Sequence, residues 1–352
     1  MDDSSVLERL VRKYSPSGDE AGAVREFVRI ARELGYATRV DAVGNGIARR
    51  GRGHPQLVFL GHIDTVVGRL PVRRRAGRVY GRGTVDAKGP LAAALLAGRD
   101  WKGPGEYLVV AAVGEETDSR GARHLVPRLR PDAVIAGEPS RWDGVTVGYK
   151  GELQLELTVR SRRTHYSSPF PTAADRALNW VVAVRSFVAA HPPDTPFRTL
   201  TVKVVEFESL RGGDEETARV TVDLRLPPGL STEEVLRSLP KPPGSPMPKV
   251  KIRDEPIEVE RTNPVVSALV EGVRAIGGRP TIWRKSGTSD LNLVLPVWAA
   301  AGASYGPGNP RLDHTERESI SLAELQRSVR VLRVAIGRLL KEGTLPSPSK
   351  GA

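Results

Sequence analysis

The sequence of 352 residues is 39% hydrophobic and 27% charged, which is typical of folded domains and excludes a disordered chain. This length is large for one hydrophobic core and suits two domains. Cysteine is absent, which excludes disulfides, thiolate nucleophiles and cysteine metal ligands. The net charge of +12 is compatible with binding to nucleic acid, with attraction of an acidic substrate, or with a basic surface that only keeps the protein soluble.

The N-terminal segment carries acidic residues where a secretory signal would carry basic ones, and no apolar segment follows it. The longest apolar stretches, such as PLAAALLAG at 90–98, are too short to cross a bilayer. We therefore expect a cytoplasmic protein without a membrane partner.

The first 150 residues alternate between helical and strand patterns. Apolar spacing predicts helices over 4–15 and 19–35, with Ser17 or Asp19 as the N-cap of the second helix. Further helices are expected at 90–99 and 120–129, and four apolar runs predict strands: Leu57–Leu60, Val79–Tyr80, Leu108–Val113 and Ala133–Ala136. This alternation predicts an α/β domain with a mostly parallel sheet.

The pattern changes at Gly151. Strict apolar alternation over 151–161 predicts a half-buried antiparallel strand, followed by a helix at 172–190, two alternating strands and a short helix at 231–238. This order predicts an inserted α+β domain at 151–255. Helical or mixed segments at 262–276, 287–304 and 319–341 then complete a discontinuous first domain made of 1–150 and 256–345.

Acidic residues and one histidine follow the four predicted strands of the first domain. They are His62 and Asp64, then Asp86, then Glu115 and Glu116, and finally Glu138. Ligands bind at the carboxyl ends of the strands in open α/β sheets, so these side chains are expected to converge. An acid two residues from a ligand histidine can also accept its second N–H, which is the role expected of Asp64.

Each of these residues alone has an ordinary structural explanation. His62 suits a buried core histidine, and Glu115 with Glu116 suits the solvated start of a helix. Their repeated position after a strand favours one shared site over several unrelated structural roles.

The motifs GHIDTV, GRGTVDAKGPLAAAL, GEETDSRGA, GEPS and a late LDHT together resemble those of the dinuclear-zinc aminoacylases and carboxypeptidases, a metallopeptidase family. The resemblance implies a zinc-exopeptidase-like catalytic domain with an inserted dimerisation or lid domain, and a homodimer. It also implies two divalent metal ions per subunit. Ligands of nitrogen and oxygen suit zinc, with cobalt or manganese as alternatives.

The resemblance also implies a role for each site residue. His62, Asp86 and Glu138 would hold one metal, and Asp86, Glu116 and His314 the other. Asp64 would orient His62, while Glu115 would be the general base. In the inserted domain, His165 would stabilise the oxyanion from its own or the neighbouring subunit.

The segments KSGTSDLN at 285–292 and GPGNPRLDHT resemble one branch of the family. Members of that branch release lysine or ornithine from the C-terminal glutamate of a small acidic amino-group carrier protein, in lysine and arginine biosynthesis. The resemblance thus implies a hydrolase of linear amides, with this carrier as its partner. Opposite charges would favour the encounter, and the clusters Arg73–Arg75 and Arg162–Arg163 are candidate contacts.

Two alternatives stay open. A deacetylase of acetylornithine or acetyl-lysine, or a dipeptidase, would use the same mechanism on a small substrate. A nucleic-acid-binding protein on an inactive hydrolase fold is disfavoured, because the catalytic positions are filled and aromatic residues make up only 5% without a basic stripe. The sequence does not separate lysine from ornithine.

Overall fold

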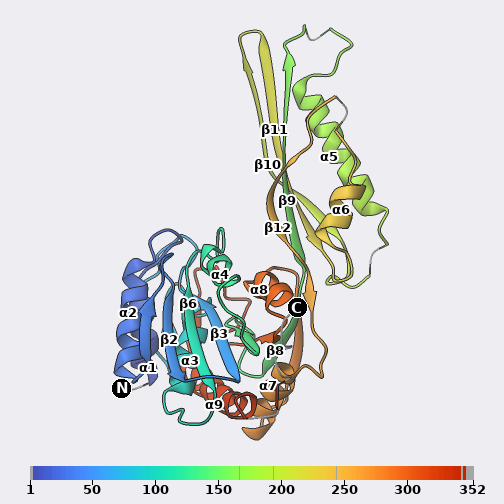
Figure 1. The fold of residues 1–352 in the computed structure, drawn as a ribbon. Helices are drawn as coiled ribbons and strands as arrows, with labels where there is room; N and C mark the ends of the chain where they lie inside the picture. Colours follow the sequence, from blue (N-terminus) through green and yellow to red (C-terminus); the bar gives the residue numbers. More distant parts are fainter. Residues whose placement is uncertain (1–2, 166, 193, 243, 342–343, 346–352) are drawn as a thin grey trace. The chain divides into compact units, whose positions relative to one another are not determined.

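The structure is a computed structural model that describes residues 3–165, 167–192, 194–242, 244–341 and 344–345 (Figure 1). The chain forms two compact units. The first consists of Met1–Gly148, Val259–Trp283 and Ser289–Ala352. The second consists of Tyr149–Glu258 and Arg284–Thr288. The chain therefore leaves the first unit at Tyr149, returns to it at Val259, and contributes the short segment Arg284–Thr288 to the second unit before it returns again.

The first unit is built on a mixed sheet whose central strands are parallel. Its order is β1-β2-β6-β3-β7-β15-β8, and β14 also pairs with β8. β3 runs parallel to β6 and β7, and β7 runs parallel to β15. The strands are β1 (Ala37–Val40), β2 (Gly46–Gly51), β3 (Gln56–His62), β6 (Glu106–Ala112), β7 (Ala133–Ala136), β8 (Gly144–Tyr149), β14 (Thr281–Lys285) and β15 (Ala301–Ser304). The predicted α/β class with a mostly parallel sheet is confirmed.

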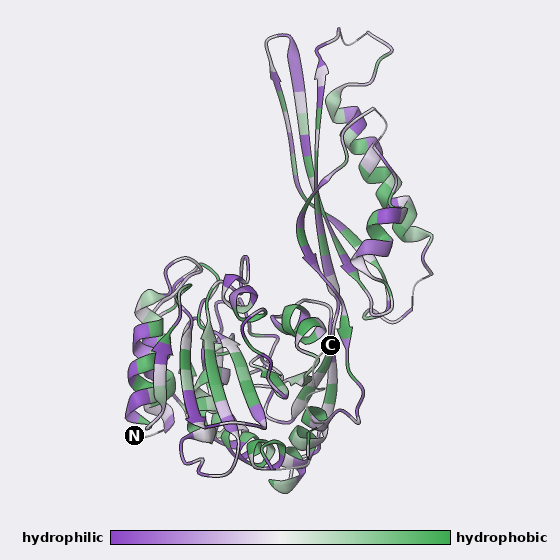
Figure 2. Ribbon diagram, viewed as in Figure 1, coloured by the Kyte–Doolittle hydropathy of each residue, from purple (hydrophilic) through white to green (hydrophobic). Residues whose placement is uncertain are grey.

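One large hydrophobic cluster joins this sheet to five helices: α1 (Asp3–Arg12), α2 (Ala21–Glu33), α3 (Lys88–Gly98), α7 (Pro264–Ala275) and α9 (Leu322–Leu339). Every residue of α3 is buried, which suits a helix that is apolar on all sides after its first residue, Lys88. Figure 2 shows the same hydrophobic character in the strands beside it. Outside this cluster, α8 (Leu291–Trp298) packs on β15, and α4 (Arg120–Leu125) packs on α8.

Two details of the first unit differ from the sequence prediction. Glu20, rather than Ser17 or Asp19, precedes the first residue of α2, and its side chain makes no capping hydrogen bond. The run at Val79–Tyr80 forms β5 (Arg78–Tyr80), which belongs to a separate antiparallel sheet with β4 (Arg73–Arg75) and β16 (Ser319–Ser321). A pair of apolar residues carries no signal that distinguishes the two sheets.

The second unit is an antiparallel sheet with helices packed against it. The sheet order is β10-β11-β9-β12, and α5 packs on its three longest strands. Its elements are β9 (Gly151–Arg162), α5 (Ala173–Ala189), β10 (Thr201–Gly212), β11 (Glu215–Leu226), α6 (Thr232–Ser238) and β12 (Lys249–Asp254), after which β13 (Ile257–Glu258) leads back to the first unit. Thr172 and Asp175 form a capping box that fixes the start of α5. Strand β12 was not predicted, because it is largely exposed and follows a proline-rich segment.

Within the described residues, no helix is both long and apolar enough to span a membrane.

Candidate metal centre

The parallel strands bring several of the predicted site residues to one edge of the central sheet. His62 is the last residue of β3, Glu115 and Glu116 follow β6, and Glu138 follows β7. β3 is paired in parallel with both β6 and β7, so the three strands end at the same edge. The sheet thereby gathers side chains that are more than 70 residues apart in sequence, as His62 and Glu138 are.

Asp86 and His314 reach the same edge from loops. Contrary to the sequence prediction, Asp86 does not follow a strand of the central sheet, since β5 belongs to the small antiparallel sheet. Its carboxylate nevertheless lies between two histidines, with Oδ1 2.9 Å from Nε2 of His62 and Oδ2 3.2 Å from Nε2 of His314. Nε2 of His314 also lies 3.0 Å from Oε1 of Glu116. His314 has a left-handed backbone (φ 57°), which is uncommon outside glycine.

Two groups of three potential ligands result, and they share Asp86. The first is His62, Asp86 and Glu138, and the second is Asp86, Glu116 and His314. Within each group, one ligand atom per residue lies within 4.8 Å of the others. Both groups have the composition that the resemblance implies for the two metals, and their occupation by metal stays a prediction.

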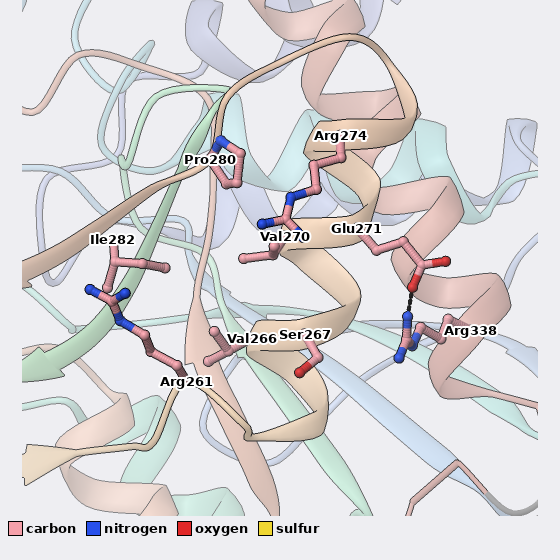
Figure 3. A pocket seen from close by; sticks show the side chains of 9 residues that line it. All are labelled: Arg261, Val266, Ser267, Val270, Glu271, Arg274, Pro280, Ile282 and Arg338. Atoms are coloured by element: carbon pink, nitrogen blue, oxygen red, sulfur yellow. Dashed lines mark ion pairs between the residues drawn. The ribbon is translucent and has the colours of Figure 1, made fainter.

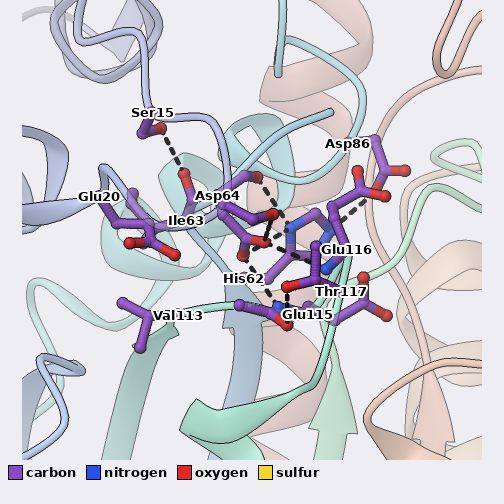
Figure 4. A network of polar contacts seen from close by, with 12 residues as sticks. Ser15, Glu20, His62, Ile63, Asp64, Asp86, Val113, Glu115, Glu116 and Thr117 are labelled. Atoms are coloured by element: carbon purple, nitrogen blue, oxygen red, sulfur yellow. Dashed lines mark hydrogen bonds and ion pairs between the residues drawn. The ribbon is translucent and has the colours of Figure 1, made fainter. Parts of the chain in front are cut away.

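Asp64 organises the site chiefly through its carboxylate (Figure 4). This fully buried group accepts the backbone N–H of Glu115 and Glu116, each at 3.1 Å, and the hydroxyl of Ser17 at 2.7 Å. Nδ1 of His62 lies 3.0 Å from the main-chain carbonyl of Asp64 and 3.6 Å from its carboxylate. The carbonyl is therefore the nearer acceptor for His62, while the carboxylate fixes the turn that presents the two glutamates.

The electrostatics of the site favour cations. Burial raises the pKa of Glu115 well above its ordinary value; His62 lowers it, whereas the negative charges of Glu138, Asp290 and Glu116 raise it further. Burial opposes the charged form of His62, yet the charges of Asp86 and Glu115 raise its pKa. The hydrogen bonds to Asp86 and Glu116 raise the pKa of His314 to about 10. Acidic charge is thus in excess over the two histidines.

This arrangement fits two divalent cations. Burying several carboxylates together raises the free energy of their charged forms unless nearby positive charge compensates them. The raised pKa of Glu115 reflects this effect. Each group offers two carboxylates and one imidazole, a donor set that suits zinc, cobalt or manganese. A carboxylate common to both groups is suited to bridging neighbouring metals.

The remaining predicted residue, His165, lies in the second unit. Its Nδ1 is 2.8 Å from the hydroxyl of Ser167 and accepts a hydrogen bond from the backbone N–H of Ser167 at 3.3 Å. In the neutral ring this leaves the proton on Nε2, so Nε2 is a donor.

Sequence reasoning did not single out two buried charged residues beside the site, Arg82 and Glu318. Arg82 lies inside the motif GRGTVDAKGPLAAAL, and Glu318 lies three residues after LDHT. Nothing in the spacing of either residue distinguishes it from a solvated surface charge.

A pocket of about 610 Å³ on α7 is separate from these residues (Figure 3). Its lining includes the apolar side chains of Val266, Val270 and Ile282. The acid in its lining, Glu271, forms an ion pair with Arg338. The lining contains no histidine, so this pocket lacks the ligand chemistry of the metal centre.

A sequence profile of Peptidase family M20/M25/M40 matches residues 58–338. The chain belongs to this family of hydrolases and is an enzyme.

Within the family, the chain is similar to named relatives over most of their length. A protein of Thermococcus kodakarensis, provisionally named a LysW-lysine/LysW-ornithine hydrolase, is 38% identical over 332 residues, or 93% of this chain and 89% of that protein. The LysW-lysine hydrolase of Deinococcus radiodurans is 35% identical over 359 residues, or 96% of this chain and 98% of that protein.

Solved structures share the fold. A family M20 metallo-carboxypeptidase from Sulfolobus solfataricus gives a TM-score of 0.77 at 16% identity, over 97% of this chain and all of that one. A tripeptidase from Staphylococcus aureus gives 0.78 at 18% identity, over 96% of this chain and 98% of that one.

Proposed function

We propose that this enzyme binds two divalent metal ions, with zinc as the first choice, and releases lysine or ornithine from an amino-group carrier protein by cutting a linear amide. The observation that carries the proposal is the pair of ligand groups that share Asp86. Full-length relatives named for hydrolysis of LysW conjugates support the substrate.

The residues divide the chemistry between them. Metal ions held by the two groups would supply positive charge that acidifies water and stabilises an oxyanion. Glu115 belongs to neither group, and we assign it the general base, which takes the proton of the attacking water and passes it to the leaving amine. Its raised pKa suits a base that must also release that proton. Asp64 holds the backbone of Glu115 in place.

His165 is the proposed donor to the oxyanion. Its Nδ1 accepts from Ser167, so its Nε2–H is the side of the ring that can donate. A positioned donor of this kind contributes on the order of 10²–10³ in kcat. It would act either in its own subunit or in the neighbouring one, and dissociation of the proposed dimer distinguishes the two cases.

Asp290 is a candidate for binding the cationic side chain of lysine or ornithine. It is buried, and its charge raises the pKa of Glu115, which places it near the proposed base. A buried acid beside the reaction centre suits an ammonium group better than a neutral substrate.

A basic surface of the first unit is the proposed docking site for the acidic carrier. Arg73–Arg75 are exposed on β4, and the loop that links the site to β4 contributes Arg69 to a small basic pocket that also includes Arg12. Opposite charges would speed the encounter of enzyme and carrier and fix their orientation. We also propose that the enzyme acts in the cytoplasm, as the sequence predicts.

The deciding experiment compares a carrier-bound lysine conjugate with free acetyl-lysine. We expect a much higher kcat/KM for the conjugate and a steep decrease as salt is raised, because screening weakens attraction between exposed charges. Charge reversal in Arg73→Glu/Arg75→Glu should lower kcat/KM for the conjugate about tenfold or more and leave acetyl-lysine hydrolysis unchanged.

A matched control reverses two exposed arginines, one in the last turn of α7 and one in the segment that follows it, in Arg274→Glu/Arg279→Glu, and changes the net charge equally. Equal losses in both variants would place the effect in overall charge rather than in docking at β4. Equal rates on the two substrates would favour a deacetylase of small molecules.

We also propose that the enzyme is a homodimer formed through the second unit. In the described part of that unit, β10 pairs with β11 and forms an edge of the sheet. Its Val205, Phe207 and Leu210 are 53%, 42% and 60% exposed, and on α5 Leu178 and Val182 are 49% and 60% exposed. A long edge strand with apolar side chains favours pairing with a second copy.

A further inference from the structure

Arg82 and Glu318 form a buried ion pair behind the metal centre. Their side chains are 7% and 1% exposed, and Nη1 of Arg82 lies 3.0 Å from Oε2 of Glu318. Neither residue is among the proposed ligands. Placing two charges away from water is costly, so a pair in this position calls for an explanation beyond its own attraction.

The other oxygen of Glu318 holds the loop that carries the shared ligand. Oε1 accepts the backbone N–H of Val85 at 2.9 Å and that of Asp86 at 3.2 Å. Glu318 itself lies four residues after His314. One carboxylate therefore connects the segment of His314 directly to the main chain of Asp86.

Arg82 connects one further segment to the same carboxylate and also binds the segment of His314. Its Nη1 donates to the carbonyl of Thr315 at 3.2 Å, directly after His314. Its Nε donates to the carbonyl of Gly68 at 3.0 Å, in the loop that follows His62 and Asp64. Through this one guanidinium, the three segments that supply His62, Asp86 and His314 are joined.

We propose that Arg82 and Glu318 are positioning residues that set the affinity of the metal centre by fixing Asp86 between the two histidines. The inference rests on the proposed metal site but not on the proposed substrate. Residues that orient metal ligands without touching the metal typically contribute 10–100-fold to metal affinity, because they remove the need to reorder the ligands on binding.

The test measures zinc affinity of the metal-free full-length chain by chelator competition. Glu318→Ala should lower the affinity of at least one site by about 10–100-fold. Glu318→Gln keeps an oxygen for the two backbone N–H groups, so it should recover part of that affinity. The visible spectrum of bound cobalt should shift in Glu318→Ala, since it reports the geometry of the ligands.

Glu26→Gln is the matched control. Glu26 is also a buried partner in an ion pair, 2.6 Å from Nε of Arg9, but its bonds to described residues lie within α1 and α2 rather than in a ligand loop. We expect this variant to lose thermal stability and to keep wild-type zinc affinity. If Glu318→Ala does not fold, Glu318→Gln decides: reduced affinity with a shifted cobalt spectrum supports positioning, and wild-type values for both overturn it.

Other outcomes are equally decisive. Wild-type affinity in Glu318→Ala, or an equal loss in Glu26→Gln, would overturn the positioning role. Failure of the wild-type chain to bind zinc or cobalt would instead overturn the proposed metal site. Failure to cleave the carrier conjugate would leave this result unaffected, because the titration involves no substrate.

Discussion

Glu115 and Glu116 are neighbours in sequence whose side chains have different surroundings. Glu116 bonds to His314 and belongs to a ligand group, whereas Glu115 belongs to neither group. Both backbone N–H groups are held by the carboxylate of Asp64, so the turn that separates the two side chains is fixed. This geometry supports the proposal that Glu116 binds metal and that Glu115 transfers protons.

The first prediction follows from that division. Glu115→Gln should bind both metals and lose about 10²–10⁴-fold in kcat, because the amide cannot accept a proton. Glu116→Gln should lose metal from the group that contains His314. Metal content and kcat of both purified variants provide the check. Normal turnover in Glu115→Gln would show that another group is the base.

A second prediction concerns protons released by metal binding. In the metal-free protein, the hydrogen bonds to Asp86 and Glu116 raise the pKa of His314 from 6.5 to about 10. The charged imidazole therefore stabilises the metal-free fold fully below pH 6.5, and this contribution is lost as the pH rises through about 10. An imidazole must be neutral to bind a metal, so metal binding between these limits displaces the proton of His314 and strengthens as the pH rises.

Calorimetry at pH 8, in two buffers with different ionisation enthalpies, measures the protons released. His62 also has a raised pKa, so we expect about two protons for full loading, and about one fewer in His314→Asn. Release that is the same in both proteins would contradict a protonated His314.

The residues of the two potential ligand groups could be predicted from sequence because each occurs in a short motif, and most follow an apolar strand. Arg82 and Glu318 could not, since burial gives them their importance and burial depends on distant contacts such as that between Arg82 and Gly68. The role of the Asp64 carboxylate was only partly predicted, because its bonds to backbone N–H groups depend on a turn that the sequence does not specify.

At the scale of elements, the strongest apolar patterns were the most informative. The helix at 90–99 and the strands at Leu57–Leu60 and Leu108–Val113 correspond to α3, β3 and β6 within a few residues. Short or exposed elements gave weaker signals: β1 is mostly exposed, and β5 was assigned to the wrong sheet. In a strand of only three or four residues, the pattern of apolar side chains is too short to identify the neighbouring strand.

A third prediction tests the packing of α7 against α9. A Cβ at Gly272 would lie 2.7 Å from the carbonyl oxygen of Val331 on α9, whereas nothing lies within 4 Å of a Cβ at Gly337. Gly272→Ala should lower the free energy of unfolding by about 1–3 kcal/mol, because overpacking outweighs the better helix propensity of alanine. Gly337→Ala should raise it by up to about 1 kcal/mol.

Urea denaturation followed by circular dichroism measures both changes. The two variants make the same chemical change in a helix, so their difference isolates the contact with Val331. Equal stabilisation in both would mean that α7 and α9 can separate without cost.

At the scale of the whole molecule, the proposed dimer makes the last prediction. In a twofold interface each substitution occurs twice and can face its own copy. Leu210→Glu on β10 and Val182→Glu on α5 should therefore place like charges in an apolar contact and yield monomers in sedimentation velocity. Val40→Glu, at a residue 51% exposed on β1 of the first unit, is the control and should stay dimeric.

The same variants decide where His165 acts. The ligand groups lie entirely in the first unit, so the monomers should keep their metal. If His165 serves the neighbouring subunit, kcat should fall by about 10²–10³ on dissociation, the usual cost of one oxyanion donor. If it serves its own subunit, the monomers should keep their turnover. A wild-type chain that sediments as a monomer, or variants that remain dimeric, would contradict an interface through β10 and α5.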